Sequence, residues 1–323
     1  MPEIPADFAA FRAFSAGLGQ NPLRVQGPGG NTSIKAGGVM WIKASGTELA
    51  DAGRRDIFVP VDRAAAVAEA RGEAGDGSCT GTVLDPARTL RPSIETTFHA
   101  ALDWPVIAHT HSIATLAHAV APEGRAVARA KLAGLPAVFV PYAKPGLPLT
   151  REIIARAKAE TRIFVLENHG LIVCGADVAA TEEMMEEVEL RLAMPARPQD
   201  SGIPTIAPPD GFDWTAESWM ARDTRACRLA CAGSYYPDHV VFLGPALPGA
   251  DFDGDRPATL IEGVGVALRR TATPSQRAML RCLSDLLIRL PTDWTPEAIG
   301  AAAEAELLDW DAEKYRQVLA ARG

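Results

Sequence analysis

A short apolar segment followed by two histidines is the part of the sequence best suited to chemistry. Residues Val106–Ser112 have the sequence VIAHTHS, and its apolar start predicts a buried strand. Side chains two positions apart on an extended chain point to the same face, so His109 and His111 would lie side by side. Paired imidazoles can bind zinc, but each histidine could equally be a structural residue bonded to the backbone. The pair alone leaves both interpretations open.

A third histidine and a carboxylate strengthen the metal hypothesis. His169 lies between two apolar runs and is followed by Gly170, which is typical of a tight turn between two strands. Glu95 lies near the start of a predicted helix whose expected N-cap is Ser93. Three histidines and one carboxylate at the ends of elements predict a mononuclear metal site with room for substrate or water.

Two loops rich in glycine and hydroxyl groups could bind a phosphate group. The first combines Gly27–Gly30 with Asn31 and Ser33, and Lys35 adds a positive charge. The second is Ala44–Thr47, directly after the predicted strand Val39–Lys43. Two such loops on neighbouring strands suit a phosphate pocket built from backbone donors, although a plain hairpin with glycine-rich turns is the alternative. Neither loop matches the Walker pattern, so a nucleotide site is not implied.

The remaining histidines and cysteines favour structural roles. We expect His99 to be a packed or capping residue, and His118 to lie within an alanine-rich helix. Cys227 and Cys231 are one helical turn apart, and we expect thiols of the core or surface there. The five cysteines are odd in number and follow no pattern, which is typical of reduced thiols in the cytosol.

Composition argues against several classes of partner. The 323 residues carry a formal net charge of −8, which disfavours a nucleic-acid platform or an anionic membrane surface. No apolar run approaches the roughly 20 residues that a membrane helix needs. The N-terminus lacks a basic segment followed by an apolar one, so no signal peptide is expected. We therefore expect a cytoplasmic protein with a small-molecule partner and neither nucleic acid nor membrane.

Patterning along the chain predicts the elements that hold these residues. Phenylalanines 8, 11 and 14 recur every three residues and predict a first helix. Further strands are expected at 57–61, 106–109, 137–141, 163–166 and 171–173, and further helices at 63–71, from 93, at 151–160 and after Asp177.

The C-terminal third is predicted to be a separate unit. We expect a catalytic domain at 1–198, a proline-rich linker at 199–213 and a small α/β appendage at 214–323. Within the appendage we expect a helix at 215–232, a strand at His239–Leu243, an apolar segment at 259–268 and helices at 274–290 and 311–321. The appendage would cover the predicted site or extend an oligomer interface. His239 could reach a neighbouring subunit, although a structural role is favoured.

Residues 5–195 resemble the class II aldolase/adducin family, which includes fuculose-phosphate aldolase, ribulose-phosphate 4-epimerase and rhamnulose-phosphate aldolase. The matching motifs follow one another in the family's order. They are Gly30-Asn31-Thr32-Ser33 and Ser45-Gly46 as phosphate loops, Pro92-Ser93-Ile94-Glu95 as P-S-S-E, His109-Thr110-His111-Ser112 as H-T-H, and Asn168-His169-Gly170 as the third histidine. The closest similarity is to the rhamnulose-phosphate aldolase-like branch.

The resemblance implies a fold, a metal site and a phosphate site. It implies an α/β, three-layer fold in which helices flank a mixed, largely antiparallel sheet, and a homotetramer with the site near a subunit interface. Zn²⁺, or another divalent metal such as Mn²⁺ or Co²⁺, would be bound by His109, His111 and His169. Glu95 would be a ligand at rest and the proton-moving base during turnover. The substrate phosphate would be held by Gly30, Asn31, Ser33, Ser45, Gly46 and Ser93.

The activity implied is that of a zinc-dependent aldolase that cleaves or forms a carbon–carbon bond in a ketose phosphate through a stabilised enediolate. An epimerase, a decarboxylase or a dehydratase on the same site is an alternative, and an adducin-like scaffold is another. Keeping all four metal-site residues favours an enzyme. Two positions depart from the family's pattern: Ile94 replaces a serine of the phosphate site, and the family's proton-donating tyrosine has no clear counterpart, with Tyr142 in the right region.

Overall fold

A mixed sheet forms the centre of the first 194 residues. The computed structural model describes residues 4–85, 87–200, 202–249 and 255–320. Within these residues the main sheet has seven strands in the order β3-β2-β1-β4-β7-β6-β5, and only β5 and β6 pair in parallel. The strands are β1 (Asn31–Ala36), β2 (Val39–Lys43), β3 (Phe58–Asp62), β4 (Val106–Thr110), β5 (Ala137–Val140), β6 (Ile163–Leu166) and β7 (Gly170–Gly175).

Helices cover both faces of this sheet, which confirms the expected three layers. Along β4, Ile107 and Ala108 point to opposite faces, as the period of a strand requires. Ala108 belongs to an apolar cluster with α1, α4, α5 and α7, whereas Ile107 packs with α3 and α6. The helices are α1 (Phe8–Gln20), α2 (Arg63–Arg71), α3 (Thr96–Ala101), α4 (Ile113–Ala119), α5 (Pro122–Lys131), α6 (Leu147–Arg156) and α7 (Val178–Leu192), with short 3₁₀ turns η1 (Leu49–Asp51) and η2 (Thr80–Thr82).

One predicted helix start is confirmed and another is wrong: the helix predicted after Asp177 begins there, whereas the helix predicted to begin at Ser93 does not. Asp177 is the N-cap of α7, and its side chain accepts a hydrogen bond from the Ala180 N–H at 2.7 Å. Helix α3 begins only at Thr96, with Glu95 at the N-cap position. Ser93 instead forms a turn before the helix, because its carbonyl accepts the Thr96 N–H and its hydroxyl accepts the Glu95 N–H at 3.3 Å.

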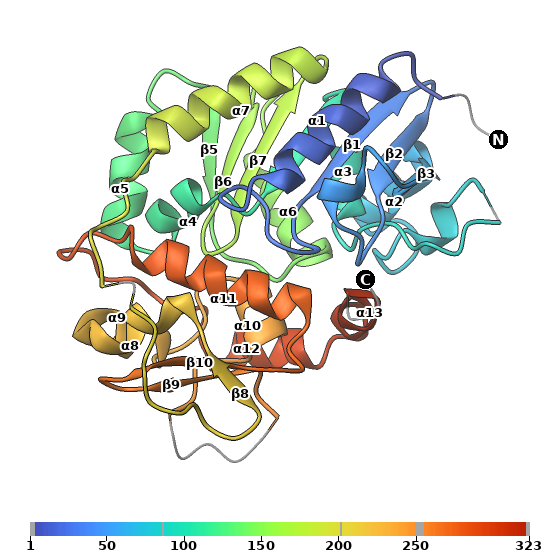
Figure 1. Ribbon diagram of the computed structural model, residues 1–323. Coiled ribbons are helices and arrows are strands. Elements are labelled where there is room, and N and C mark those ends of the chain that lie inside the picture. Colours follow the sequence, from blue (N-terminus) through green and yellow to red (C-terminus); the bar gives the residue numbers. More distant parts are fainter. Residues whose placement is uncertain (1–3, 86, 201, 250–254, 321–323) are drawn as a thin grey trace.

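The C-terminal third adds a second, smaller sheet and a group of helices. In the described residues this sheet is antiparallel, with three strands in the order β8-β10-β9. In Figure 1 these elements, coloured yellow to red, lie on one side of the main sheet, and α11 runs along the boundary. The elements are β8 (Phe212–Trp214), η3 (Ala216–Ser218), α8 (Trp219–Arg222), α9 (Thr224–Ala230), α10 (Pro237–Leu243), β9 (Ala258–Ile261), β10 (Gly265–Arg269), α11 (Pro274–Leu287), α12 (Ala301–Leu308) and α13 (Asp311–Ala320).

Two expectations for this part of the chain are corrected by the structure, and one is made more specific. The segment His239–Leu243 is part of helix α10, not a strand. Every residue of α10 is buried, so its valine-rich run shows no helical period, and Pro237 occupies the first turn. The helix expected at 215–232 is divided at Asp223, which N-caps α9. The apolar segment 259–268 is the β9–β10 hairpin, with Gly263 in the left-handed region at φ +74°.

The C-terminal third shares a core with the first part of the chain. One apolar cluster contains residues of α8 to α11 together with Ile113, Leu116 and Ala117 of α4 and Val120 at its C-cap. Arg125 and Glu297 add an ion pair at 2.9 Å. The division into domains at 198 and a linker at 199–213 stays a prediction. Among the described residues, no helix is long and apolar enough to cross a membrane.

Candidate metal centre

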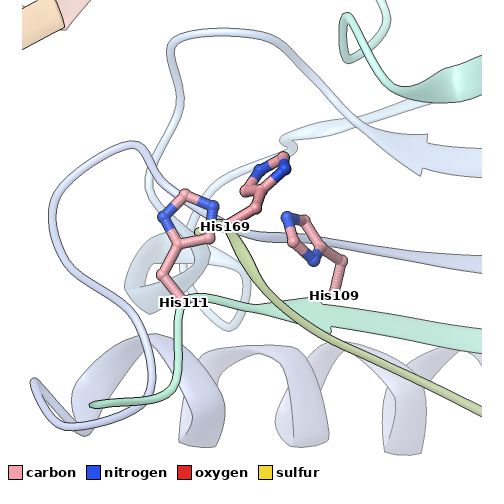
Figure 2. Close-up of side chains that lie close together, drawn as sticks. All are labelled: His109, His111 and His169. Atoms are coloured by element: carbon pink, nitrogen blue, oxygen red, sulfur yellow. The ribbon is translucent and has the colours of Figure 1, made fainter. Parts of the chain in front are cut away.

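Three histidines meet where strands β4 and β7 lie next to each other. His109 is the fourth residue of β4 and pairs with Ile172 of β7, while His111 follows the strand and His169 lies in the β6–β7 turn. The ring centroid of His109 lies 5.0 Å from that of His111 and 4.9 Å from that of His169. Figure 2 shows the three rings around one point, and one ligand nitrogen from each lies within 4.8 Å of the others. This arrangement can hold a metal ion.

Two glycines allow the strands to approach closely here. A Cβ atom on Gly170 would lie 2.3 Å from the Thr110 carbonyl oxygen, so only glycine fits beside the end of β4. Gly30 has a φ of +58°, and a Cβ there would lie 2.8 Å from the His109 carbonyl oxygen. Backbone geometry at these glycines therefore fixes the positions of the histidines.

Glu95 faces the same point. Its Oε2 lies 3.4 Å from His109 Nε2, and its Oε1 lies 3.5 Å from His169 Nε2. The side-chain amide of Asn31 donates a hydrogen bond to Glu95 Oε2 at 2.8 Å. Asn31 is brought there by strand pairing, because it lies opposite His109 in the β1–β4 register.

His99 has the structural role that the sequence favoured. It is fully buried, and its Nε2 is hydrogen-bonded to Asn31 Oδ1 while its Nδ1 is hydrogen-bonded to Ser33 Oγ at 2.8 Å. The Asn31 amide also donates to Ser93 Oγ at 3.1 Å. A chain of side chains thus runs from Ser33 through His99 and Asn31 to Glu95 and fixes the carboxylate.

Burial sets the charge states in this cluster. It lowers the pKa of His109 to about 4 and that of His169 to about 3. Burial alone would raise the pKa of Glu95, but the imidazoles of His109 and His169 and the amide of Asn31 outweigh it and lower the value. Neutral imidazoles beside a carboxylate anion are the forms that bind cations.

The donor set also fits a divalent metal. His109 Nε2 and Glu95 Oε1 are buried and have no hydrogen-bond partner among the described residues. Unsatisfied buried polar atoms are costly, and a cation between them would satisfy both. Nitrogen from imidazoles with a carboxylate oxygen is a set that zinc accepts, and manganese and cobalt also bind such ligands.

Most residues of the predicted phosphate site line one cavity beside the histidines. Backbone bonds join the second loop to the segment before α3, because the Ser93 N–H donates to the Lys43 carbonyl and the Ser45 N–H donates to the Arg91 carbonyl. The hydroxyl of Ser45 is buried with no hydrogen-bond partner among the described residues. Predicted residues that line the cavity are Gly30, Asn31, Ser45, Gly46, Ser93, Glu95, His111 and His169, together with Ile94.

Ser33 and Lys35 lie outside this cavity. Ser33 is bonded to His99 as described, and the Lys35 ammonium donates to two backbone carbonyls at the far end of β1, those of Leu102 and Trp104. The lysine that does line the cavity is Lys43, the last residue of β2. Its Nζ donates to the Pro28 carbonyl at 2.9 Å, and burial lowers its pKa to about 7. A charged residue that ends an otherwise apolar strand, two positions before Ser45, is the signal that could have found it.

The C-terminal third supplies residues that sequence reasoning missed. Asp238 of α10 and Glu313 and Arg316 of α13 line the same cavity. No local motif marks them, because only tertiary packing brings them there. Helix α13 lies directly over the second loop: a Cβ on Gly46 would be 2.7 Å from Leu319 Cβ. The cavity that remains has a volume of about 20 Å³, which holds roughly one water molecule.

The C-terminal third therefore covers the predicted site, which was one of the two roles expected for it from the sequence. His239 does not face this cavity; it is buried in its own chain, and its Nδ1 accepts the Tyr235 N–H at 3.4 Å. Tyr142 is not among the described residues that line the cavity. Its hydroxyl has no hydrogen-bond partner in the described part of the chain, and burial raises its pKa.

Comparison with known proteins gives a consistent family. Residues 19–194 match the family described as Class II Aldolase and Adducin N-terminal domain. A relative from Bacillus subtilis (strain 168), named uncharacterized oxidoreductase YuxG, is 30% identical in an alignment of 163 residues that covers 46% of this chain and 23% of the relative. The chain thus spans about a quarter of the length of this curated relative.

One solved structure shows a similar fold, and a second is reported beside it. The N-terminal class II aldolase domain of a conserved protein from Thermoplasma acidophilum has a TM-score of 0.52 and 24% identity, covering 59% of this chain and 94% of its own. A sugar-phosphate aldolase from Thermotoga maritima has a TM-score of 0.44 and 14% identity, covering 57% of this chain and 91% of its own. The family match covers more than half of the chain, and this protein therefore belongs to the class II aldolase and adducin family.

Proposed function

We propose that this protein is a metal-dependent carbon–carbon lyase that acts on a small ketose phosphate. The observation that carries the proposal is the convergence of three imidazoles and the carboxylate of Glu95 in one buried cluster. Zn²⁺ is the metal that we propose first, with Mn²⁺ or Co²⁺ as alternatives. His109, His111, His169 and Glu95 are the residues that would hold it.

Glu95 is positioned to move a proton. Asn31 holds Oε2, while Oε1 has no hydrogen-bond partner among the described residues and is the oxygen that we assign as the base. The lowered pKa keeps the carboxylate ionised at neutral pH, so it can accept a proton from a substrate carbon and later return it. A divalent metal at this site would act as a Lewis acid and stabilise the negative charge that develops on the substrate.

The phosphate end of the substrate would lie against the two loops. Ser45, Gly46 and Ser93 offer hydroxyl and backbone donors, and Ile94 provides none from its side chain. We assign Lys43 as the positive charge at this end. With a pKa near 7, its ammonium form becomes more favourable when a dianion enters the cavity. A sugar phosphate is larger than the cavity, so α13 must shift when substrate binds.

Assembly and location belong to the same proposal. Family membership supports a homo-oligomer, which we propose to be a tetramer, and a cytoplasmic enzyme of carbohydrate metabolism. Epimerisation, decarboxylation and dehydration can run on the same donor set, since each needs a stabilised anion and a proton-moving carboxylate. A non-catalytic scaffold is disfavoured, because it has no need for Glu95 beside three imidazoles.

Proton exchange into dihydroxyacetone phosphate tests the proposal. The protein is loaded with zinc, its metal content is measured, and the ketose is followed by proton NMR in heavy water. We expect stereospecific loss of one proton signal at C3, the hydroxymethyl carbon, because formation of an enediolate removes that proton. The Glu95→Gln variant with zinc bound is the matched control and should show no exchange.

The opposite result would redirect the assignment. If the zinc-loaded protein leaves both C3 protons in place, the aldolase proposal on this ketose is wrong. Epimerase, decarboxylase and dehydratase substrates would then be tried on the same preparation. If the protein retains no divalent metal, the metal-dependent mechanism itself is wrong.

A further inference from the structure

His111 has a carboxylate partner that comes from the C-terminal third of the chain. Asp238 Oδ2 lies 3.1 Å from His111 Nδ1, and the two side chains are only 1% and 6% exposed. In Figure 2 one ring nitrogen of His111 faces the other two imidazoles, and the second nitrogen faces away from them. The contact with Asp238 thus uses one nitrogen and leaves the other for a metal.

The backbone is shaped for this contact. A Cβ atom on Gly29 would lie 2.8 Å from His111 Nδ1 and 2.9 Å from Asp238 Oδ2. Any other residue at position 29 would therefore push the imidazole and the carboxylate apart. The first glycine-rich loop thus accommodates the pair in addition to lining the cavity.

Asp238 is itself held firmly. Arg316 of α13 donates through Nη2 to Asp238 Oδ1, and through Nη1 to both carboxylate oxygens of Glu313 at 3.1 Å. All three side chains are buried. Asp238 is therefore held by a guanidinium through one oxygen, and its second oxygen is directed at His111.

His109 shows the same pattern with a different acceptor. Its Nδ1 is 3.0 Å from the Leu171 carbonyl oxygen, which leaves Nε2 directed at Glu95. An acceptor on one ring nitrogen fixes the tautomer and the orientation of a metal-binding histidine, and a carboxylate acceptor also makes the imidazole a stronger donor.

We propose that Asp238 is a positioning residue of the metal centre, which orients His111 through Nδ1 and is anchored by Arg316. This inference rests on the proposed metal site and extends it to α10 and α13, elements outside the part of the chain that matches the family. In consequence the C-terminal third contributes to metal affinity as well as covering the cavity.

Zinc affinity of the Asp238→Asn variant tests the proposal. Zinc is titrated against a chromophoric chelator of known affinity, so the readout does not depend on turnover. We expect zinc to bind 10- to 100-fold more weakly than in the parent protein, the range typical of losing such a partner. Arg316 keeps Glu313 as an ion-pair partner in this variant, so the substitution does not leave a buried cation alone.

Glu304→Gln is the matched control. Glu304 is a buried carboxylate of α12 that accepts the Ser234 N–H at 3.0 Å. The Glu304→Gln variant tests whether the loss of any buried acid in the C-terminal third weakens zinc binding by destabilising the fold in general. We expect its zinc affinity to equal that of the parent protein. Thermal unfolding of the metal-free variants shows whether each remains folded.

Nitrogen-15 NMR of the zinc-loaded parent protein gives a second, independent readout. We expect a protonated Nδ1 and a metal-bound Nε2 at His111. Metal binding through Nδ1 would overturn the proposal even if the Asp238→Asn variant did not fold. Unchanged zinc affinity in a folded Asp238→Asn variant would overturn it too, while leaving the proposed function intact. Absence of zinc binding in the parent protein would instead refute the proposed function.

Discussion

Glu95 is the residue whose surroundings most clearly indicate chemistry. It is buried, and yet two imidazoles and the Asn31 amide keep it ionised. A carboxylate needed only for structure would be expected to have both oxygens hydrogen-bonded, whereas Oε1 has no such partner among the described residues. This combination supports the proposed role of Glu95 as metal ligand and base over that of a simple buried acid.

Replacing Glu95 with glutamine should separate metal binding from turnover. Glutamine keeps the shape and one oxygen, so the three imidazoles should still retain the metal. It cannot accept a proton, so we expect turnover to fall by about 10²- to 10⁴-fold. Metal content by atomic spectroscopy and initial rates check this. Undiminished turnover would remove Glu95 from the mechanism.

Replacing His109 with alanine should abolish both metal binding and turnover. The imidazole of His109 lies beside Glu95, and its ring centroid is within 5.0 Å of those of the other two histidines, so its loss would leave the proposed ligand set incomplete. His118→Ala is a suitable control, because His118 is also buried but bonds only to the Ala114 carbonyl and to Lys131 among the described residues. We expect the control to retain metal. A fully active, metal-free His109→Ala variant would rule the site out.

At the scale of residues, spacing predicted part of the centre and missed the rest. A His-x-His pair at a strand end and a histidine before a turn glycine are local patterns, so His109, His111 and His169 could be found from the sequence. Asp238 and Arg316 could not, because they are far away in sequence and no local motif marks them. Only the fold brings them to His111.

At the scale of elements, prediction worked where one face of an element is buried. Helix α7 has a clear N-cap and an apolar stripe, and its start was predicted to the residue. Helix α10 is buried on all sides, so its apolar run has no period and was taken as a strand. The single long helix expected at 215–232 is not formed, because the side chain of Asp223 caps the start of a new helix, α9.

The contact between Gly46 and α13 gives a prediction at this scale. Gly46 has a φ of +74° and lies against Leu319, whereas Gly37 has a φ of +56° and nothing within 4 Å of its would-be Cβ. Alanine at either site costs roughly 1–2 kcal/mol of backbone strain. Only Gly46→Ala also displaces α13, so we expect a further loss of about 1–3 kcal/mol in the free energy of unfolding.

Two measurements compare these variants. Denaturant unfolding gives the free energies, and the rate at which a chelator removes bound zinc reports on the cover over the cavity. We expect faster removal for Gly46→Ala than for Gly37→Ala, because a displaced α13 admits the chelator. Equal rates and equal stabilities would show that α13 does not rest on the second loop in solution.

At the scale of the whole molecule, buried histidines make the metal-free protein sensitive to acid. Burial lowers the pKa of five of the six histidines, namely His99, His109, His118, His169 and His239. In the unfolded chain these residues take up protons near pH 6.5. The unfolded state therefore binds more protons than the folded state below that pH, and the free energy of unfolding falls as the pH falls.

We expect a lower melting temperature at pH 5 than at pH 7 for the metal-free protein. Burial raises the pKa values of two carboxyls, Glu189 and Glu313, and these oppose the trend by at most one proton each, fewer than the five histidines contribute. Calorimetry at the two pH values measures the difference, and bound zinc should reduce it by competing with protons at the ligands. An identical melting temperature at both pH values would contradict this account.

The sequence predicted the architecture of the first part of the chain better than that of the last. The family motifs lie within 30–170 and imply the sheet that carries them, and the structure has that sheet. For the last third no motif was available, and its position over the cavity depends on packing between α4 and α8 to α11. Long-range packing of this kind leaves little local trace in a sequence.

The position of α13 over the cavity also has a consequence for how the protein is made. A ribosome releases the segment with the three histidines and Glu95 well before it releases Arg316. At roughly 5–20 residues per second, His169 precedes Arg316 by roughly 7–30 s. The proposed metal can therefore reach these residues during synthesis, before the last helix covers the cavity. The newly made chain offers it a more open route than the finished fold does.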